Sequence, residues 1–224
     1  CREKVKQGKT SFGFLHVMLA AYVRTVSQRP AINRFISGQK VFGRNDIQIV
    51  MTIKKTLSID APDTCIKVRF EPTDTVDEIY DKFNTVVAAV QNAPEEVNSF
   101  DKLNKLLSLI PGLLCRWTVK LLNFLDYFGL LPKKLLWLSP FHGSMIITSM
   151  GSLGIKPIYH HIYNFGTTGV LMTMGNSREV PKRNADGEIY HEKCIPFGVV
   201  MDERLSSGSY LAHAFRKFKN YLKD

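Results

Sequence analysis

A strand, a mainly polar turn and a helix follow one another near the carboxyl end, and this stretch constrains the fold more than any other. The apolar segment Phe197–Met201 predicts a buried strand, and the segment Asp202–Ser207 predicts a turn. Gly208 opens a helix that extends to Leu222. Its apolar stripe is formed by Ala212, Phe215, Phe218 and Leu222. A turn after a buried strand is held rigidly and often presents reactive side chains, so we predict an α/β protein with a candidate site here.

The composition fits a single globular domain. The chain has 224 residues, of which 45% are hydrophobic and 22% charged. The formal net charge is +10, which favours anionic partners such as nucleotide phosphates, nucleic acid or an acidic membrane surface. The charges are spread along the chain, and the sequence lacks the aromatic–basic interleaving of RNA-binding modules. We therefore expect a solvated basic surface, no nucleic-acid partner and no membrane contact.

Four cysteines, Cys1, Cys65, Cys115 and Cys194, indicate the compartment. None belongs to a C-x-x-C pair, so no zinc or other metal site is predicted. Unpaired cysteines favour a reducing, cytoplasmic location, and no signal peptide is recognised at the start. Because the chain begins at a cysteine inside a helix-like stretch, we expect that an amino-terminal segment is missing.

The first half of the chain alternates between helical and strand patterns. Expected elements are a helix end at Arg2–Gln7 capped by Gly8, a helix over Ser11–Ser27, and two short strands around Gly38. They are followed by strands at Asp46–Leu57 and Ile66–Phe70 joined through a Pro62-Asp63 turn, and a helix from Asp74 or Thr75 to about Asn92. Glu78 stands near the capping-box position of that helix.

A Leu-, Phe- and Trp-rich stretch at 100–138 is the least typical part of the sequence. Prolines, glycines and charges interrupt it, so no run reaches the ~18 apolar residues of a membrane span. It predicts two or three amphipathic helices. Three roles stay open: a helical cover over a sheet face, the wall of an apolar substrate pocket, or interfacial contact with a membrane.

The second half predicts mostly strands. They are expected at Ser144–Ser149, Ile158–Tyr163, Gly169–Met174 and Ile189–Met201, the last bent by Pro196. A polar loop at Lys182–Gly187 ends in Asp186-Gly187, a hairpin signal. No repeat or low-complexity linker divides the chain, so residues 1–224 are predicted to form one domain.

Four segments, in this order, resemble the catalytic domain of dihydrolipoamide acyltransferases and the related chloramphenicol acetyltransferases. They are Arg29–Phe35, Ile147–Gly154, Tyr159–Met174 and Asp202–Ser209. The resemblance covers nearly the whole chain except a helical insertion at about 100–141. It implies a two-layer α/β sandwich with a mixed sheet and helices on one face. It also implies a homotrimer with active sites between subunits.

The resemblance implies a CoA-dependent acyl transfer, with acyl-CoA as cosubstrate and a small hydroxyl, amine or thiol acceptor. In the family, the histidine of an H-x-x-x-D-G motif removes the proton from a CoA thiol or an acceptor group. A hydroxyl from the neighbouring subunit stabilises the oxyanion, a contribution of ~3 kcal/mol in such sites. Here the histidine position is Glu203 and the aspartate position Ser207, while the oxyanion position is Thr148 with Ser149 adjacent. The motif positions that still match are Asp202, Arg204 and Gly208.

The two replacements leave the chemistry open. Glutamate has a reference pKa of ~4.3, about two units below histidine, so a carboxylate is the weaker base unless burial raises its pKa. Arg204 would oppose that rise if it paired with Glu203. His142, His160 or His161 could serve as another base, although neighbouring residues of a strand point to opposite faces, which argues against a shared metal site. The alternative function is a non-catalytic trimer that binds CoA or an acyl ligand.

Overall fold

The computed structural model describes residues 1–54, 63–92 and 108–223. Its first elements are α1 (Arg2–Lys6), α2 (Phe14–Gln28), the 3-10 turn η1 (Pro30–Asn33), β1 (Arg34–Ser37), β2 (Lys40–Gly43), β3 (Ile47–Lys54), β4 (Asp63–Phe70) and α3 (Val76–Asn92). The remaining elements are α5 (Gly112–Tyr127), α6 (Lys133–Leu138), β5 (Met145–Ser149), η2 (Gly151–Leu153), β6 (Val170–Met174), β7 (Arg178–Arg183), β8 (Ile189–Cys194), β9 (Phe197–Met201) and α7 (Gly208–Tyr221).

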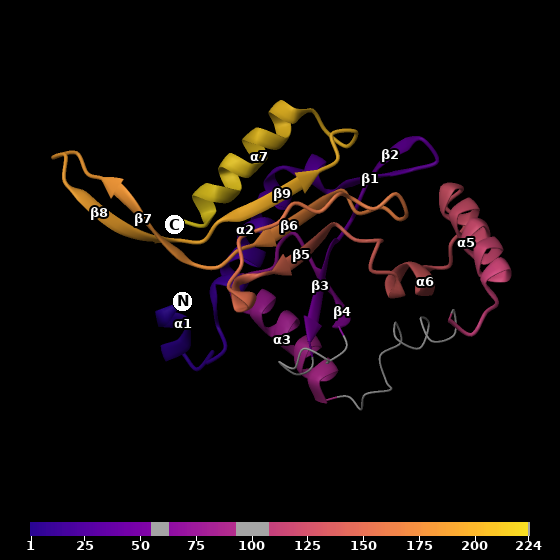
Figure 1. The fold of residues 1–224 in the computed structure, drawn as a ribbon, viewed down its shortest axis with the longest axis horizontal. Helices are drawn as coiled ribbons and strands as arrows, with labels where there is room; N and C mark the ends of the chain where they lie inside the picture. Colours follow the sequence, from indigo (N-terminus) through magenta and orange to yellow (C-terminus); the bar gives the residue numbers. More distant parts are fainter. Residues whose placement is uncertain (55–62, 93–107, 224) are drawn as a thin grey trace.

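A five-stranded mixed sheet forms the centre, in the order β4-β3-β5-β6-β9. The two inner pairings, β3 with β5 and β5 with β6, are parallel, and the two outer pairings are antiparallel. Helices α2, α3 and α7 pack on one face of this sheet (Figure 1). The predicted two-layer α/β sandwich with a mixed sheet is therefore confirmed.

The core forms because alternate strand residues meet the apolar stripes of these helices. Ile47 and Ile49 of β3 and Met145 and Ile147 of β5 point to the helical layer and are almost fully buried. The helices contribute Met18, Leu19, Tyr22 and Val23 from α2, Ile79 and Phe83 from α3, and Leu211, Ala214 and Phe218 from α7. Each fully buried side chain of this size stabilises the fold by roughly 1.5–3 kcal/mol.

Most expected elements of the first half are found, with shifted ends. Helix α2 begins at Phe14 and not at Ser11, because the backbone N–H of Gly13 is bonded by the ring of His16 at 3.1 Å. The hydroxyl of Ser11 instead forms a hydrogen bond of 2.8 Å with Tyr80. The capping box of α3 is confirmed at Thr75, whose backbone N–H donates to the Glu78 carboxylate at 2.7 Å. Helix α3 is described as far as Asn92, the predicted end. The predicted Pro62-Asp63 turn includes Pro62, which lies outside the described residues.

Two strand predictions in the second half are wrong. Residues 158–163 form no strand. Their contact with β6 is a side-chain hydrogen bond, which the Thr173 hydroxyl donates to the Ile158 carbonyl at 2.6 Å, and not a backbone ladder. The expected bent strand Ile189–Met201 is two strands, because Pro196 interrupts it and the parts pair with different partners. The first part, β8, forms a hairpin with β7 that projects from the sheet (Figure 1).

The described part of the insertion forms the helices α5 and α6, as predicted, but α5 does not cover the sheet; residues 100–107 lie outside the described residues. No residue of α5 is buried, and the helix stands apart from the sheet in Figure 1. Leu113 and Trp117 are 76% and 61% exposed. Among the described residues of the insertion, the carboxyl end is anchored: Leu131 is buried, and Gly38 of the β1–β2 turn comes close to the Tyr127 carbonyl. Across the three described ranges, no helix has the length and apolar character needed to cross a membrane.

Candidate active site

The turn after β9 is built around Asp202. Its backbone N–H donates to the Gly169 carbonyl at 3.0 Å, which fixes the start of the turn to the beginning of β6. Its carboxylate accepts hydrogen bonds from the backbone and the guanidinium of Arg204, the shortest at 2.6 Å. These bonds from Arg204 lower the pKa of Asp202. Leu205 closes the turn by packing against Gly169, where a side chain would leave no space.

Glu203 lies next in the turn and is exposed. Its carboxylate reaches back over the first residue of α7, since a Cβ added to Gly208 would lie 3.1 Å from the Glu203 Oε1. The amino end of a helix favours negative charge, so this position suits a carboxylate. Arg204 forms its ion pair with Asp202 and not with Glu203. The condition under which Arg204 would oppose a raised pKa of Glu203, an ion pair between the two side chains, is therefore not met.

Ser207 caps the helix that follows. It is the N-cap residue of α7, and its hydroxyl accepts from the backbone N–H of Tyr210 at 3.5 Å. Serine is among the preferred residues at this position, because its oxygen satisfies one of the free N–H groups of the first turn. The residue at the motif's aspartate position thus has a local structural role.

Thr148 and Ser149 lie at the opposite end of the sheet from Glu203. They form the carboxyl end of β5 and pair with Thr173 and Met174 of β6. Glu203 follows β9, whose last residue pairs with Val170 at the other end of β6. Along β6, Val170 at one end and Met174 at the other are four residue steps apart, which is roughly 13 Å at the usual rise of a strand. One copy of the chain therefore does not bring Glu203 and Thr148 into one site.

The histidines proposed as alternative bases occupy different settings. His160 and His161 are exposed on the segment between η2 and β6, and the Nδ1–H of His161 donates to the Ile162 carbonyl at 2.9 Å. His142 is buried, and both of its ring nitrogens have partners: Ser139 at 2.7 Å and Asp126 at 3.1 Å. His142 thus links α5 to the start of β5, with no ring nitrogen left for a substrate.

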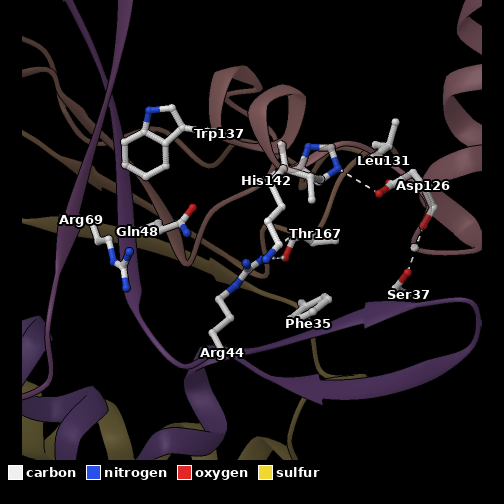
Figure 2. Close-up of a pocket in the computed structure, with 13 residues that line it drawn as sticks. Phe35, Ser37, Arg44, Gln48, Arg69, Asp126, Leu131, Trp137, His142 and Thr167 are labelled. Carbon is white, nitrogen blue, oxygen red and sulfur yellow. Dashed lines mark hydrogen bonds and ion pairs between the residues drawn. The ribbon is translucent and has the colours of Figure 1, made fainter.

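A cavity of about 450 Å³ lies between the β1–β2 hairpin, the start of β3 and the carboxyl half of the insertion (Figure 2). Arg44, Arg69, Asp126 and His142 give it charged and polar walls. Apolar walls come from Phe35, Leu131, Leu136 and Trp137. Of the three roles open for the Leu-, Phe- and Trp-rich stretch, lining an apolar pocket is the one that this arrangement supports.

Solved structures share this architecture, although no protein-family model matches the sequence and no curated protein resembles it. A probable dihydrolipoamide acetyltransferase from Listeria monocytogenes 4b F2365 aligns with a TM-score of 0.59 and 13% identity, over 93% of this chain and 69% of that chain. The dihydrolipoamide acetyltransferase of Azotobacter vinelandii gives 0.63 and 11%, over 100% and 75%. Chloramphenicol acetyltransferase gives 0.50 and 13%, over 99% and 82%. The chain has the dihydrolipoamide acetyltransferase fold.

The comparison confirms the fold that the four resembling segments implied. For the Azotobacter enzyme, a serine, a histidine and an asparagine have been investigated for their role in the catalytic mechanism. In the present chain with the acetyltransferase fold, the turn with the H-x-x-x-D-G spacing carries Glu203 and Ser207. Among the described residues no group of three or more His, Cys, Asp or Glu side chains could hold a metal ion.

Sequence reasoning missed two cations near the cavity, Arg44 and Lys67. Arg44 follows a short strand, and Lys67 alternates with buried residues in β4, so both resemble ordinary surface positions in the sequence. The structure instead buries both to a large extent, and burial lowers the pKa of Arg44 to about 10 and that of Lys67 to about 7. The only sequence signal was the neighbouring apolar insertion, which supplies the cover.

Proposed function

We propose that this protein is a CoA-dependent acyltransferase in which Glu203 stands in place of the motif histidine. The observation that carries the proposal is the position of this carboxylate, exposed after β9 and beside the amino end of α7, on an acetyltransferase fold. The three solved structures named above are acetyltransferases by name, one of them a probable one. The basic character of the chain, +10, suits the phosphates of CoA.

In the proposed reaction, the Glu203 carboxylate removes the proton of an acceptor hydroxyl, thiol or amine. The acceptor then attacks the thioester carbonyl of acyl-CoA and forms a tetrahedral intermediate. A hydroxyl of Thr148, or of the adjacent Ser149, donates a hydrogen bond to the oxyanion. The intermediate collapses with cleavage of the carbon–sulfur bond, and the CoA thiolate recovers the proton from the Glu203 carboxylic acid.

This mechanism requires more than one copy of the chain. Glu203 and Thr148 lie at opposite ends of β6 within one copy, so a second copy must supply the hydroxyl. A closed ring of three copies, as the resemblance implies, gives each Glu203 a Thr148 from its neighbour. The homotrimer is therefore part of the proposal.

The test measures thiol release from acetyl-CoA with a panel of hydroxyl, amine and thiol acceptors. We expect Glu203→Gln to lower turnover about 100-fold, the usual contribution of a general base. Glu179→Gln, an exposed position on β7, is the matched control and should keep full turnover. Unchanged turnover in Glu203→Gln would exclude the proposed base.

Mixing two inactive variants tests the shared site. Glu203→Gln and Thr148→Val are each expected to be inactive, but mixed trimers contain interfaces with both native residues. Partial recovery of activity after subunit exchange supports the intermolecular site. A monomer in sedimentation equilibrium, or no recovery in proven mixed trimers, contradicts it.

The alternative function is a non-catalytic trimer that binds CoA or an acyl ligand. It is favoured by the hydrogen bond through which Ser207 caps α7 and by the loss of both the histidine and the aspartate of the motif. Calorimetry with CoA and acetyl-CoA separates the two: saturable binding without thiol release supports the alternative. Absence of binding counts against both functions.

A further inference from the structure

Arg44 projects into the cavity without an acidic partner. Its Nη2 donates to the backbone carbonyl and the hydroxyl of Thr167, at 3.0 and 2.6 Å, and the guanidinium lies 4.5 Å from the centre of the Phe35 ring (Figure 2). Its Nε is buried and has no hydrogen-bond partner. Asp46, two residues along the chain, forms its ion pair with Arg69 at 3.1 Å. Among the described residues, no carboxylate forms an ion pair with Arg44.

A second cation, Lys67, lies close to the same cavity. Its Nζ donates to the backbone carbonyls of Leu136 and His142, at 2.8 and 2.7 Å, and lies 5.7 Å from the centre of the Trp137 ring. Burial, followed by the charge of Arg44, lowers the pKa of Lys67. Burial of a cation without an acid partner is costly. Near pH 7 Lys67 is only partly protonated, so the positive charge without an acid partner at the cavity wall is that of Arg44.

The acids around the cavity are already engaged. Asp126 is bonded to His142 at 3.1 Å, and Arg69 is paired with both Asp46 and Glu71. Lys133 adds a further positive charge at the rim. Inside the rim, an anion would therefore meet Arg44 as the cation without a carboxylate partner.

The remaining walls are apolar and aromatic. Phe35, Leu131, Leu136 and Trp137 line the same space as Arg44. The volume of about 450 Å³ lies within the range of small-molecule sites, which combine apolar walls with a few polar groups that fix orientation. The chemistry thus suits a molecule with one anionic end and an apolar body.

We propose that this cavity binds a small organic monocarboxylate, with its carboxylate on Arg44 and its apolar body against Leu136 and Trp137. A guanidinium presents a planar set of donors that matches a carboxylate. The single unpaired guanidinium matches a single negative charge. This site stands apart from acyl transfer, because it uses neither Glu203 nor Thr148.

Calorimetric titration of the whole chain tests the site with hexanoate, benzoate, acetate and hexanamide. Hexanoate and benzoate are expected to bind saturably with one site per chain. Hexanamide, which lacks the charge, should bind at least about tenfold more weakly, as loss of one charged hydrogen bond predicts. Acetate, which lacks the apolar body, should also bind at least about tenfold more weakly, because it buries no CH₂ groups against the apolar wall. No saturable binding of either larger carboxylate, or equal binding of hexanamide, would overturn the proposal.

Paired arginine variants locate the bound carboxylate. Arg44→Gln is expected to weaken hexanoate binding about tenfold or more, whereas Arg34→Gln changes the same charge on an exposed residue of the same hairpin and should leave binding unchanged. Equal losses in both variants would indicate general attraction to a basic surface and contradict the site. Should Arg44→Gln fail to fold by circular dichroism, Trp137→Ala and a crystal structure with para-bromobenzoate decide. A bromine position outside the cavity, or unchanged binding in Trp137→Ala, would overturn the proposal.

Discussion

Helices α2 and α5 are both amphipathic, yet they are held in the molecule by different forces. Met18, Leu19, Tyr22 and Val23 of α2 are at most 1% exposed. Four apolar side chains of α5, Leu113, Trp117, Leu121 and Phe124, are each more than half exposed. Similar helical spacing thus leads to a core helix in one region and, among the described residues, to a helix with no buried side chain in the other.

In the described part of the insertion, polar contacts attach the carboxyl end to the rest of the molecule. The side chain of Asp126 forms a hydrogen bond with the ring of His142. The backbone carbonyl of Asp126 accepts a second hydrogen bond, of 3.0 Å, from the Ser37 hydroxyl. Lys67 holds the Leu136 carbonyl. An apolar stripe therefore predicts that a segment is a helix. Which surface that stripe packs against depends on contacts with residues distant in the sequence.

The largest expected contrast is between two leucines, one from each helix. Leu19→Ala in α2 should lower the free energy of unfolding by about 3 kcal/mol, because it leaves a cavity in the core. Leu121→Ala in α5 should change it by less than about 0.5 kcal/mol, because the side chain is 57% exposed. Urea unfolding measures both. A loss of equal size in Leu121→Ala would show that the Leu121 side chain is covered in solution.

Lys67 provides a test that depends on pH. Its pKa is about 7 in the folded protein and 10.5 in the unfolded chain, so between these values the unfolded state binds more protons. Stability should therefore rise as the pH increases from about 7 toward 10.5, by at most about 1.4 kcal/mol per pH unit. In Lys67→Met this contribution should vanish, which urea unfolding at a series of pH values would show. Identical slopes in both proteins would mean that Lys67 is not buried as described.

Asp126→Ala should loosen the insertion and leave the core intact. The variant leaves the buried ring nitrogen of His142 without its partner, a loss of about 1–3 kcal/mol. Hydrogen exchange should accelerate in α5 and α6, while α2 stays protected. Uniform acceleration in all three helices would contradict the separation of the two regions.

Sequence reasoning was most successful where local rules and burial agree. The strand pattern of β3, the capping box at Thr75 and the turn before α7 follow from alternation and capping chemistry. The predicted stripe of α7 is wrong in part: Phe218 is buried, but Ala212 is exposed, and Leu211 and Ala214 are buried in its place. The local pattern predicts a strand at residues 158–163, but strand formation also requires backbone pairing with a neighbouring strand, which this segment lacks in the structure. The cavity around Arg44 depends on contacts between residues far apart in the sequence. Arg44 and Thr167, for example, are 123 residues apart, and no local pattern encodes their hydrogen bond.

The smallest expected effect concerns Ser207, where a core helix meets the candidate site. Ser207→Ala removes the cap of α7 and should cost about 1 kcal/mol in urea unfolding. Helix α7 itself should persist, because Leu211, Ala214 and Phe218 remain buried. Ser207→Asp keeps a good capping residue and should stay within about 0.5 kcal/mol of the native protein. If aspartate proved as destabilising as alanine, the role of Ser207 would lie outside capping. The replacement of the motif's aspartate would then require a reason in the site itself.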